Sequence, residues 1–217
     1  MLEGGNEIKT ILIGDCNTGK STLYNSFISG GDGGGGHNAD GPTIAWDFGW
    51  REIHTPSYGH ICFKLWDTSG AEKFNSLAMT QTYYRNTEGV LLVFDLTNRT
   101  SFRNISEVWL RRVRSSLTID ASYKCILIGN KSDLTSLRQV TTEEALELSQ
   151  SLNMCYVELS SIHSSAEEIL QPFLMLAVQV MDERGLLHIG EPRRRDAITL
   201  GNDVPPVEEK RTHCCVT

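Results

Sequence analysis

A glycine-rich segment near the start of the chain has the spacing of a phosphate-binding loop. Residues 14–21 read GDCNTGKS, which matches the pattern G-x-x-x-x-G-K-[ST] after an apolar run (8–14) and before a helical pattern (20–29). In this context the loop amides and the helix N-terminus can surround a diphosphate, Lys20 can reach the outer phosphates, and Ser21 can ligate Mg²⁺. A chance glycine turn is the competing interpretation, and the full pattern disfavours it. The predicted nucleotide contacts are Asp15, Cys16, Asn17, Thr18, Gly19, Lys20, Ser21 and Thr22.

A second segment supplies candidates for a metal ion and for the outermost phosphate. Asp67 ends the apolar run 61–67 and begins the sequence DTSG. An acidic residue after a strand holds Mg²⁺ in P-loop enzymes, here through a water. Gly70 leaves its amide available to a γ-phosphate. We therefore expect Asp67 to join Ser21 at the metal.

The segment NKSD, residues 130–133, predicts which base the nucleotide carries. A carboxylate such as Asp133 can accept hydrogen bonds from both the N1–H and the exocyclic amine of guanine, whereas adenine offers no such pair. Four residues can also match by chance in a surface turn. Their place one strand–helix unit downstream favours a guanine site, with Asn130, Lys131 and Asp133 as its contacts.

The elements that must position these residues alternate along the chain. Nearly continuous apolar runs indicate strands covered on both faces of a mostly parallel sheet, and the more alternating segment 44–54 indicates an antiparallel edge strand. This order predicts an α/β doubly wound domain with its ligand at the carboxyl ends of the strands. The strand runs are 8–14, 61–67, 90–96, 124–130 and 155–161. The helical patterns are 20–29, 72–84, 101–117, 141–152 and 165–184.

With these motifs in order, the chain resembles the Rab family of the Ras superfamily from Glu7 to Arg184. The resemblance implies a P-loop NTPase G domain, with a six-stranded mostly parallel sheet and helices on both faces, over residues 1–184. Residues 185–217 are expected to be a disordered tail. The segment PTIAWDF (42–48) resembles the first switch, in which Thr43 would contact Mg²⁺ and the γ-phosphate. The other residues assigned by resemblance are Ser160, Ser161 and Ile162 beside guanine, and Phe48, Trp66 and Tyr83 on the effector surface.

The resemblance also implies a GTP/GDP switch that uses Mg²⁺ and regulates vesicle traffic. Lys20, Thr43 and Gly70 would act on the γ-phosphate. Cys214 and Cys215, in the terminal sequence CCVT, look like a double geranylgeranylation signal, with a C-a-a-X signal at Cys214 as the alternative. Two lipids anchor a protein stably to a membrane. The expected location is therefore the cytoplasmic face of an intracellular membrane, with a cytosolic pool. The expected partners are effectors, exchange factors, TBC-type activating proteins, and GDI and escort proteins.

Several residues depart from the family pattern. Ala71 stands where the family keeps a glutamine that positions the attacking water, so we expect slow intrinsic hydrolysis. Activating proteins of the TBC type are understood to bring their own glutamine and arginine. Ile162 replaces a lysine beside guanine, and no Phe or Tyr lies between Phe27 and Trp46 to cover the base, so we expect weaker nucleotide retention.

The amino-acid composition argues against some classes of function. The formal net charge is −7, from 20 Lys and Arg against 27 Asp and Glu, which argues against a nucleic-acid partner. No apolar run reaches the roughly 18–20 residues of a membrane span. Two other classes remain open beside the switch. One is a nucleotide-stabilised, largely non-hydrolysing binding scaffold on membranes, which stays GTP-bound or hardly binds nucleotide at all. The other is a different P-loop class such as a kinase, which the guanine motif disfavours.

Overall fold

A computed structural model describes residues 6–30, 46–55, 57–68, 84–116 and 122–186 of the chain. Several predictions lie outside these residues: the helix over 72–84 up to residue 83, the roles of Thr43, Gly70, Ala71 and Tyr83, and the tail beyond residue 186 with Cys214 and Cys215. The domain boundary between residues 184 and 185 accordingly stays a prediction.

Six strands form one sheet at the centre of the domain, in the order β2-β3-β1-β4-β5-β6. All neighbouring pairs are parallel except β2 and β3, which are antiparallel and place β2 at the edge. The predicted fold class and the antiparallel edge strand are thus confirmed. The strands are β1 (Glu7–Ile13), β2 (Trp46–Thr55), β3 (Gly59–Thr68), β4 (Gly89–Asp95), β5 (Lys124–Asn130) and β6 (Cys155–Glu158).

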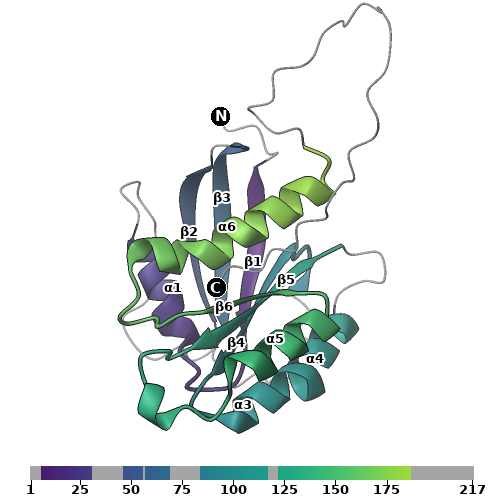
Figure 1. Cartoon of the computed structure of the whole chain (residues 1–217). Coiled ribbons are helices and arrows are strands. Elements are labelled where there is room, and N and C mark those ends of the chain that lie inside the picture. Colours follow the sequence, from purple (N-terminus) through teal and green to yellow (C-terminus); the bar gives the residue numbers. More distant parts are fainter. Residues whose placement is uncertain (1–5, 31–45, 56, 69–83, 117–121, 187–217) are drawn as a thin grey trace, which may run out of the picture.

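Helices cover both faces of the sheet (Figure 1). One core joins β1 residues such as Ile8 and Leu12 to α1 (Lys20–Ser29) and α6 (Ala166–Glu183). The other joins Ile11 and Ile13 to the helices of the opposite face. Alternate residues of β1 therefore serve different cores, which explains why the central strands read as unbroken apolar runs. The opposite face carries α3 (Arg99–Asn104), α4 (Leu110–Ser116) and α5 (Thr142–Ser151).

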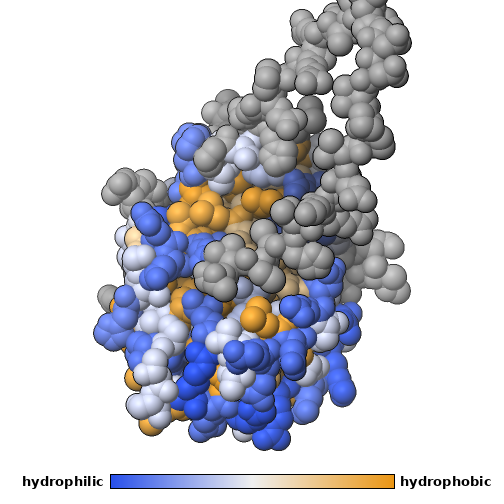
Figure 2. Space-filling model, viewed as in Figure 1, coloured by the Kyte–Doolittle hydropathy of each residue, from blue (hydrophilic) through white to orange (hydrophobic). Residues whose placement is uncertain are grey.

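With the apolar side chains divided between the two cores, the exterior is mostly polar. Figure 2 shows a largely hydrophilic surface on the face viewed there, with separate hydrophobic areas. Among the described residues, no helix combines the length and the apolar character that a membrane span requires.

The helix predicted over 101–117 differs from the observed structure. Asn98 caps the N-terminus of α3, with its side chain accepting from two backbone amides, so the helix begins two residues earlier. A π-helical turn, Ile105–Trp109, then separates α3 from α4. An apolar period of 3.6 residues does not reveal one wider turn, so the interruption was missed. The strand predicted over 155–161 ends at Glu158, because the chain turns beyond it.

Capping boxes set the starts of the last two helices. Thr141 with Glu144 caps α5, and Ser165 with Glu168 caps α6, each through reciprocal side-chain and backbone hydrogen bonds. The Arg99 side chain also bonds Glu144, and this contact, followed by the backbone bond from Thr141, lowers the pKa of Glu144 to about 2. These contacts fix α5 against the start of α3.

Arg51, a buried cation on β2, holds the C-terminal end of α1. Its guanidinium donates to the carbonyl of Phe27 at 2.6 Å and to that of Gly30 at 2.8 Å. It also lies 5.0 Å from the centre of the Phe27 ring, which stacks on Phe173 of α6. One side chain thus satisfies the last carbonyls of the helix and joins β2 to the core.

We expect the change Arg51→Ala to lower the free energy of unfolding by about 2 kcal/mol, since it leaves buried carbonyls without their charged donor. Urea unfolding followed by circular dichroism measures the loss. Arg103→Ala, at an exposed position on α3, is the matched control and should leave the midpoint nearly unchanged. Equal midpoints for the two variants would contradict the role given to Arg51.

Candidate functional site

The predicted phosphate loop connects β1 to α1 at the point where the strand order changes direction. Strands β2 and β3 lie on one side of β1, and β4, β5 and β6 lie on the other. In doubly wound sheets, ligands bind in the crevice at this switch point. The N-cap of α1 is Gly19, which has no side chain to cap the helix, so backbone amides form its N-terminus. Such a terminus attracts anions.

Lys20, the first residue of α1, lies across this loop. Its side chain is 4% exposed, and its ammonium donates to the carbonyls of Gly14 at 3.0 Å and Asp15 at 2.9 Å. The hydroxyl of Thr18 also donates to the Asp15 carbonyl, at 2.9 Å. The loop is therefore folded by its own side chains around a buried positive charge, an arrangement that suits a phosphate ligand.

Two positions in the loop require glycine. Gly19 has φ 90°, and a Cβ there would lie 2.2 Å from Nδ2 of Asn130. A Cβ at Gly14 would lie 2.0 Å from the carbonyl oxygen of Val93. At Asn17 the φ of 63° falls in the left-handed region, which asparagine tolerates better than most residues. The neighbouring Cys16 is exposed and takes part in no disulfide.

Asn130, at the end of β5, joins three of the predicted segments. Its side-chain amide is 2% exposed and donates to the carbonyl of Thr18 at 2.8 Å. Its oxygen accepts from the amide of Lys131 at 2.8 Å and from the amide and hydroxyl of Ser161, each at 3.0 Å. The side chain of Asn130 thus connects the predicted phosphate loop with both segments that are predicted to lie beside guanine.

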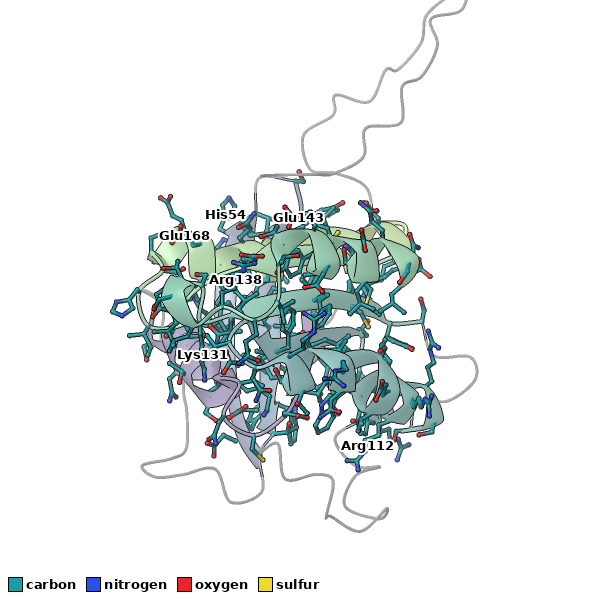
Figure 3. The ribbon with its side chains drawn as sticks, turned by 60° about the horizontal axis from the view of Figure 1, so that its bottom comes forward. His54, Arg112, Lys131, Arg138, Glu143 and Glu168 are labelled. Atoms are coloured by element: carbon teal, nitrogen blue, oxygen red, sulfur yellow. The ribbon has the colours of Figure 1, made fainter. Side chains whose placement is uncertain are left out.

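The other residues predicted to contact guanine lie at the same end of the sheet. Asp133 keeps 25% of its side chain exposed, and its carboxylate is 3.9 Å from Nε2 of His163. Lys131 (labelled in Figure 3) places its ammonium 2.7 Å from the carboxylate of Asp95, the last residue of β4. Ile162, at the position of the family's lysine, is 74% exposed. The arrangement presents one partly exposed carboxylate, which can accept two hydrogen bonds from a guanine edge.

The predicted metal residue Asp67 is fully buried near the end of β3, where the neighbouring Thr68 donates to the Leu12 carbonyl of β1 at 2.8 Å. Asp67 lies directly opposite Asp47 of β2. Burial raises the pKa of the nearby Tyr24 to about 12, and the charges of Asp47 and Asp67 add to the rise. Nothing in the alternating positions of 44–54 singles out Asp47 in the sequence.

Two carboxylates at opposed cross-strand positions repel each other, so this end of the sheet favours a cation. Across the described residues, no group of three or more His, Cys, Asp or Glu is gathered as a metal cage. Mg²⁺ fits such a site, since it is bound through few carboxylates together with waters and phosphates. Asp67 and Ser21 are the described residues that would hold it.

Asp15 is one of the predicted nucleotide contacts, and its carboxylate accepts hydrogen bonds from two protein donors. One oxygen accepts from Nε1 of Trp109 at 2.8 Å, and the other accepts from Nδ2 of Asn104 at 2.6 Å. Both donors come from the helical segment after β4, and nothing in the sequence pattern indicated either of them. What Asp15 offers a ligand at this loop is therefore its backbone.

Comparison with known proteins identifies the family. A model of the Ras family matches residues 9–182. The chain belongs to the Ras family. Ras-related protein RABA1e of Arabidopsis thaliana is 34% identical over 211 residues, which cover 95% of this chain and 93% of the relative. Ras-related protein Rab-39A of Homo sapiens is 37% identical over 176 residues, covering 81% and 78%. GTP-binding protein ypt3 of Schizosaccharomyces pombe is 35% identical over 180 residues, covering 82% and 79%.

The match confirms the predicted resemblance to Rab proteins, and the chain is a small GTPase of the Ras family. Binding of GTP and GDP and hydrolysis of GTP are general to this family. The described part of the site agrees with that activity, since Lys20, Asn130 and Asp133 gather at one end of the sheet.

The structure also brings together two of the three aromatic residues assigned to the effector surface of this Ras-family chain. Phe48 and Trp66 are opposite each other on β2 and β3, both half-buried, with ring centres 4.9 Å apart. Lys9 of β1 lies 5.1 Å from the centre of the Trp66 ring. The third residue, Tyr83, lies outside the described residues. The pair forms a partly exposed aromatic surface beside Asp67, near the end of β3.

Proposed function

We propose that this Ras-family protein is a Rab-type GTP/GDP switch that regulates vesicle traffic. The observation that carries the proposal is the side chain of Asn130, which binds the phosphate loop and both guanine-side segments together. A nucleotide would contact all of these segments, from its phosphates to its base, so their connection through one side chain supports a nucleotide ligand. In the GTP state, Thr43 and Gly70 would hold the two switch segments to the γ-phosphate, and effectors would recognise the ordered surface around Phe48 and Trp66.

The proposed hydrolysis is slow without partners. Lys20 and the helix N-terminus stabilise charge on the phosphates, and Mg²⁺ held by Ser21, Thr43 and Asp67 would neutralise the developing charge. Ala71 carries only a methyl group, which cannot orient the attacking water. We therefore propose that turnover depends on TBC-type activating proteins.

The proposed site of action is the cytoplasmic face of an intracellular membrane, with a cytosolic pool. Lipids on Cys214 and Cys215 would supply the anchor, and two chains hold a protein far more stably than one. GDI and escort proteins would carry the lipidated chain, and exchange factors would reload it. These partners are proposed from the Rab resemblance.

A membrane-bound scaffold that hardly hydrolyses GTP is the second candidate. The exposed Ile162 in place of a lysine and the alanine at Ala71 favour it. Against a scaffold that hardly binds nucleotide stands the polar set of the phosphate loop, since a module without ligand has little reason to keep the buried ammonium of Lys20.

Single-turnover hydrolysis distinguishes the two candidates. Purified protein is loaded with radiolabelled GTP and Mg²⁺, and retained nucleotide and released phosphate are followed over hours. We expect retained GTP, with phosphate release slower than the order of 10⁻⁴ s⁻¹ seen for unassisted Ras. Because a glutamine can orient water, Ala71→Gln should accelerate release on the order of tenfold.

Two results would argue against the switch, and a third would argue against the role given to Ala71. Failure to retain GTP favours the scaffold. Retention with no phosphate release from either protein does the same. Equal release rates for both proteins contradict the role given to the residue at position 71.

A further inference from the structure

The carboxylate of Asp15 is a buried negative charge inside the loop that is proposed to bind negatively charged phosphates. Asp15 is 8% exposed. Its backbone carbonyl is bound by Lys20 and Thr18, so its position is part of the loop's own fold. A like charge this close to a phosphate weakens binding unless it is directed away. What holds the Asp15 side chain therefore bears on nucleotide retention.

Trp109 and Asn104 hold it toward the face of the sheet opposite α1. The indole Nε1–H and the amide Nδ2–H each donate to one carboxylate oxygen, at 2.8 and 2.6 Å. Trp109 belongs to the core on the α4 side, whereas α1, whose N-terminus faces the phosphate site, packs in the other core. Both donors are neutral, so they satisfy the carboxylate without cancelling its charge.

The π-helical turn brings these two donors into register. Residues five positions apart in an α-helix point about 140° away from each other. The wider turn, in which the amide of Leu110 bonds the carbonyl of Ile105, brings such residues close to one face. Asn104 immediately precedes this turn and Trp109 ends it. π turns often occur at functional sites, and this one serves the phosphate loop.

We propose that Trp109 and Asn104 are positioning residues for nucleotide binding, which keep the Asp15 carboxylate out of the phosphate cradle. Without them the carboxylate is left to bond the loop amides that a diphosphate needs. Neither residue touches the nucleotide. The inference rests on the proposed nucleotide site and adds to it residues that no motif contains.

The test is a double-mutant cycle on full-length protein loaded with fluorescent GDP. Trp109→Phe removes the indole donor and keeps most of the ring volume, and we expect GDP release to accelerate on the order of tenfold. In the Asp15→Asn background the charge is absent, so the same change should alter release by less than about twofold. Trp50→Phe, at an exposed position on β2, is the matched control and should leave release unchanged.

Equal acceleration by Trp109→Phe in both backgrounds would mean that Trp109 acts through packing alone, and no acceleration in either would remove its role altogether. Both results overturn the proposal. If the unmodified protein does not retain GDP, the proposed function fails, and the contact is then tested separately. The Trp109 indole N–H resonance, assigned from its loss in Trp109→Phe, should move upfield in Asp15→Asn, and an unmoved resonance overturns the contact.

Discussion

Asp133→Asn is expected to weaken GDP binding about 10³-fold and to shift preference toward xanthosine diphosphate. The carboxylate accepts from both N1–H and the exocyclic amine of guanine, whereas an amide in its place offers its oxygen to one of these groups and turns a donor NH₂ toward the other. Xanthine has a carbonyl where guanine has the amine, so the amide donor then meets an acceptor. Competition of both diphosphates against fluorescent GDP measures the shift.

The control for this change is Asp182→Asn. Asp182 lies on α6, far along the chain from residues 130–133, and its carboxylate accepts a hydrogen bond from the hydroxyl of Tyr58. It should leave the base preference intact. If Asp133→Asn retains GDP as the unmodified protein does, then Asp133 does not read the base.

A second large effect is expected for Asn130→Ala, which removes four hydrogen bonds from a buried position. The carbonyl of Thr18 and the amide of Ser161 would lose their partner while staying buried, so the free energy of unfolding should fall by about 3 kcal/mol. GDP release should accelerate on the order of a hundredfold, because the loop and the base-side segments would no longer be tied together.

Asn6→Ala gives the comparison, since it removes one exposed hydrogen bond to the carbonyl of His60 at 2.9 Å. Its unfolding free energy and GDP release should both stay close to those of the unmodified protein. A normal GDP release rate in Asn130→Ala, whatever its stability, would show that Asn130 does not organise the nucleotide site.

The sheet and the loops at its carboxyl edge could be predicted because short-range patterns determine them. The run 90–96 predicts a doubly covered strand, and β4 is buried along its whole length from Gly89 to Asp95. The phosphate loop and the guanine segment are recognisable because their residues are contiguous. Parallel strands place all such loops at one edge, so their proximity followed from the fold class.

The contacts that complete the site could not be predicted, because they join residues far apart in the sequence. Asn104 and Trp109 are 89 and 94 residues from Asp15, and only the packing of α3 and α4 brings them to it. The π turn that aligns these two residues cannot be recognised from the spacing of apolar residues, which fits an uninterrupted α-helix as well. Asn130 was recognised as a site residue, and its role as a junction depends on three segments meeting at one side chain.

The exposed thiol of Cys16 allows thiol-specific reagents to label the phosphate loop. Among the described cysteines, Cys125 is buried and Cys62 and Cys155 are half-buried, and burial raises the pKa of both Cys62 and Cys125. A thiolate is the species that alkylating reagents attack, so these two react slowly. An electrophile attached to a phosphate mimic would therefore meet one accessible sulfur at the mouth of the site. A probe attached covalently to Cys16 could therefore report whether the proposed phosphate site is occupied.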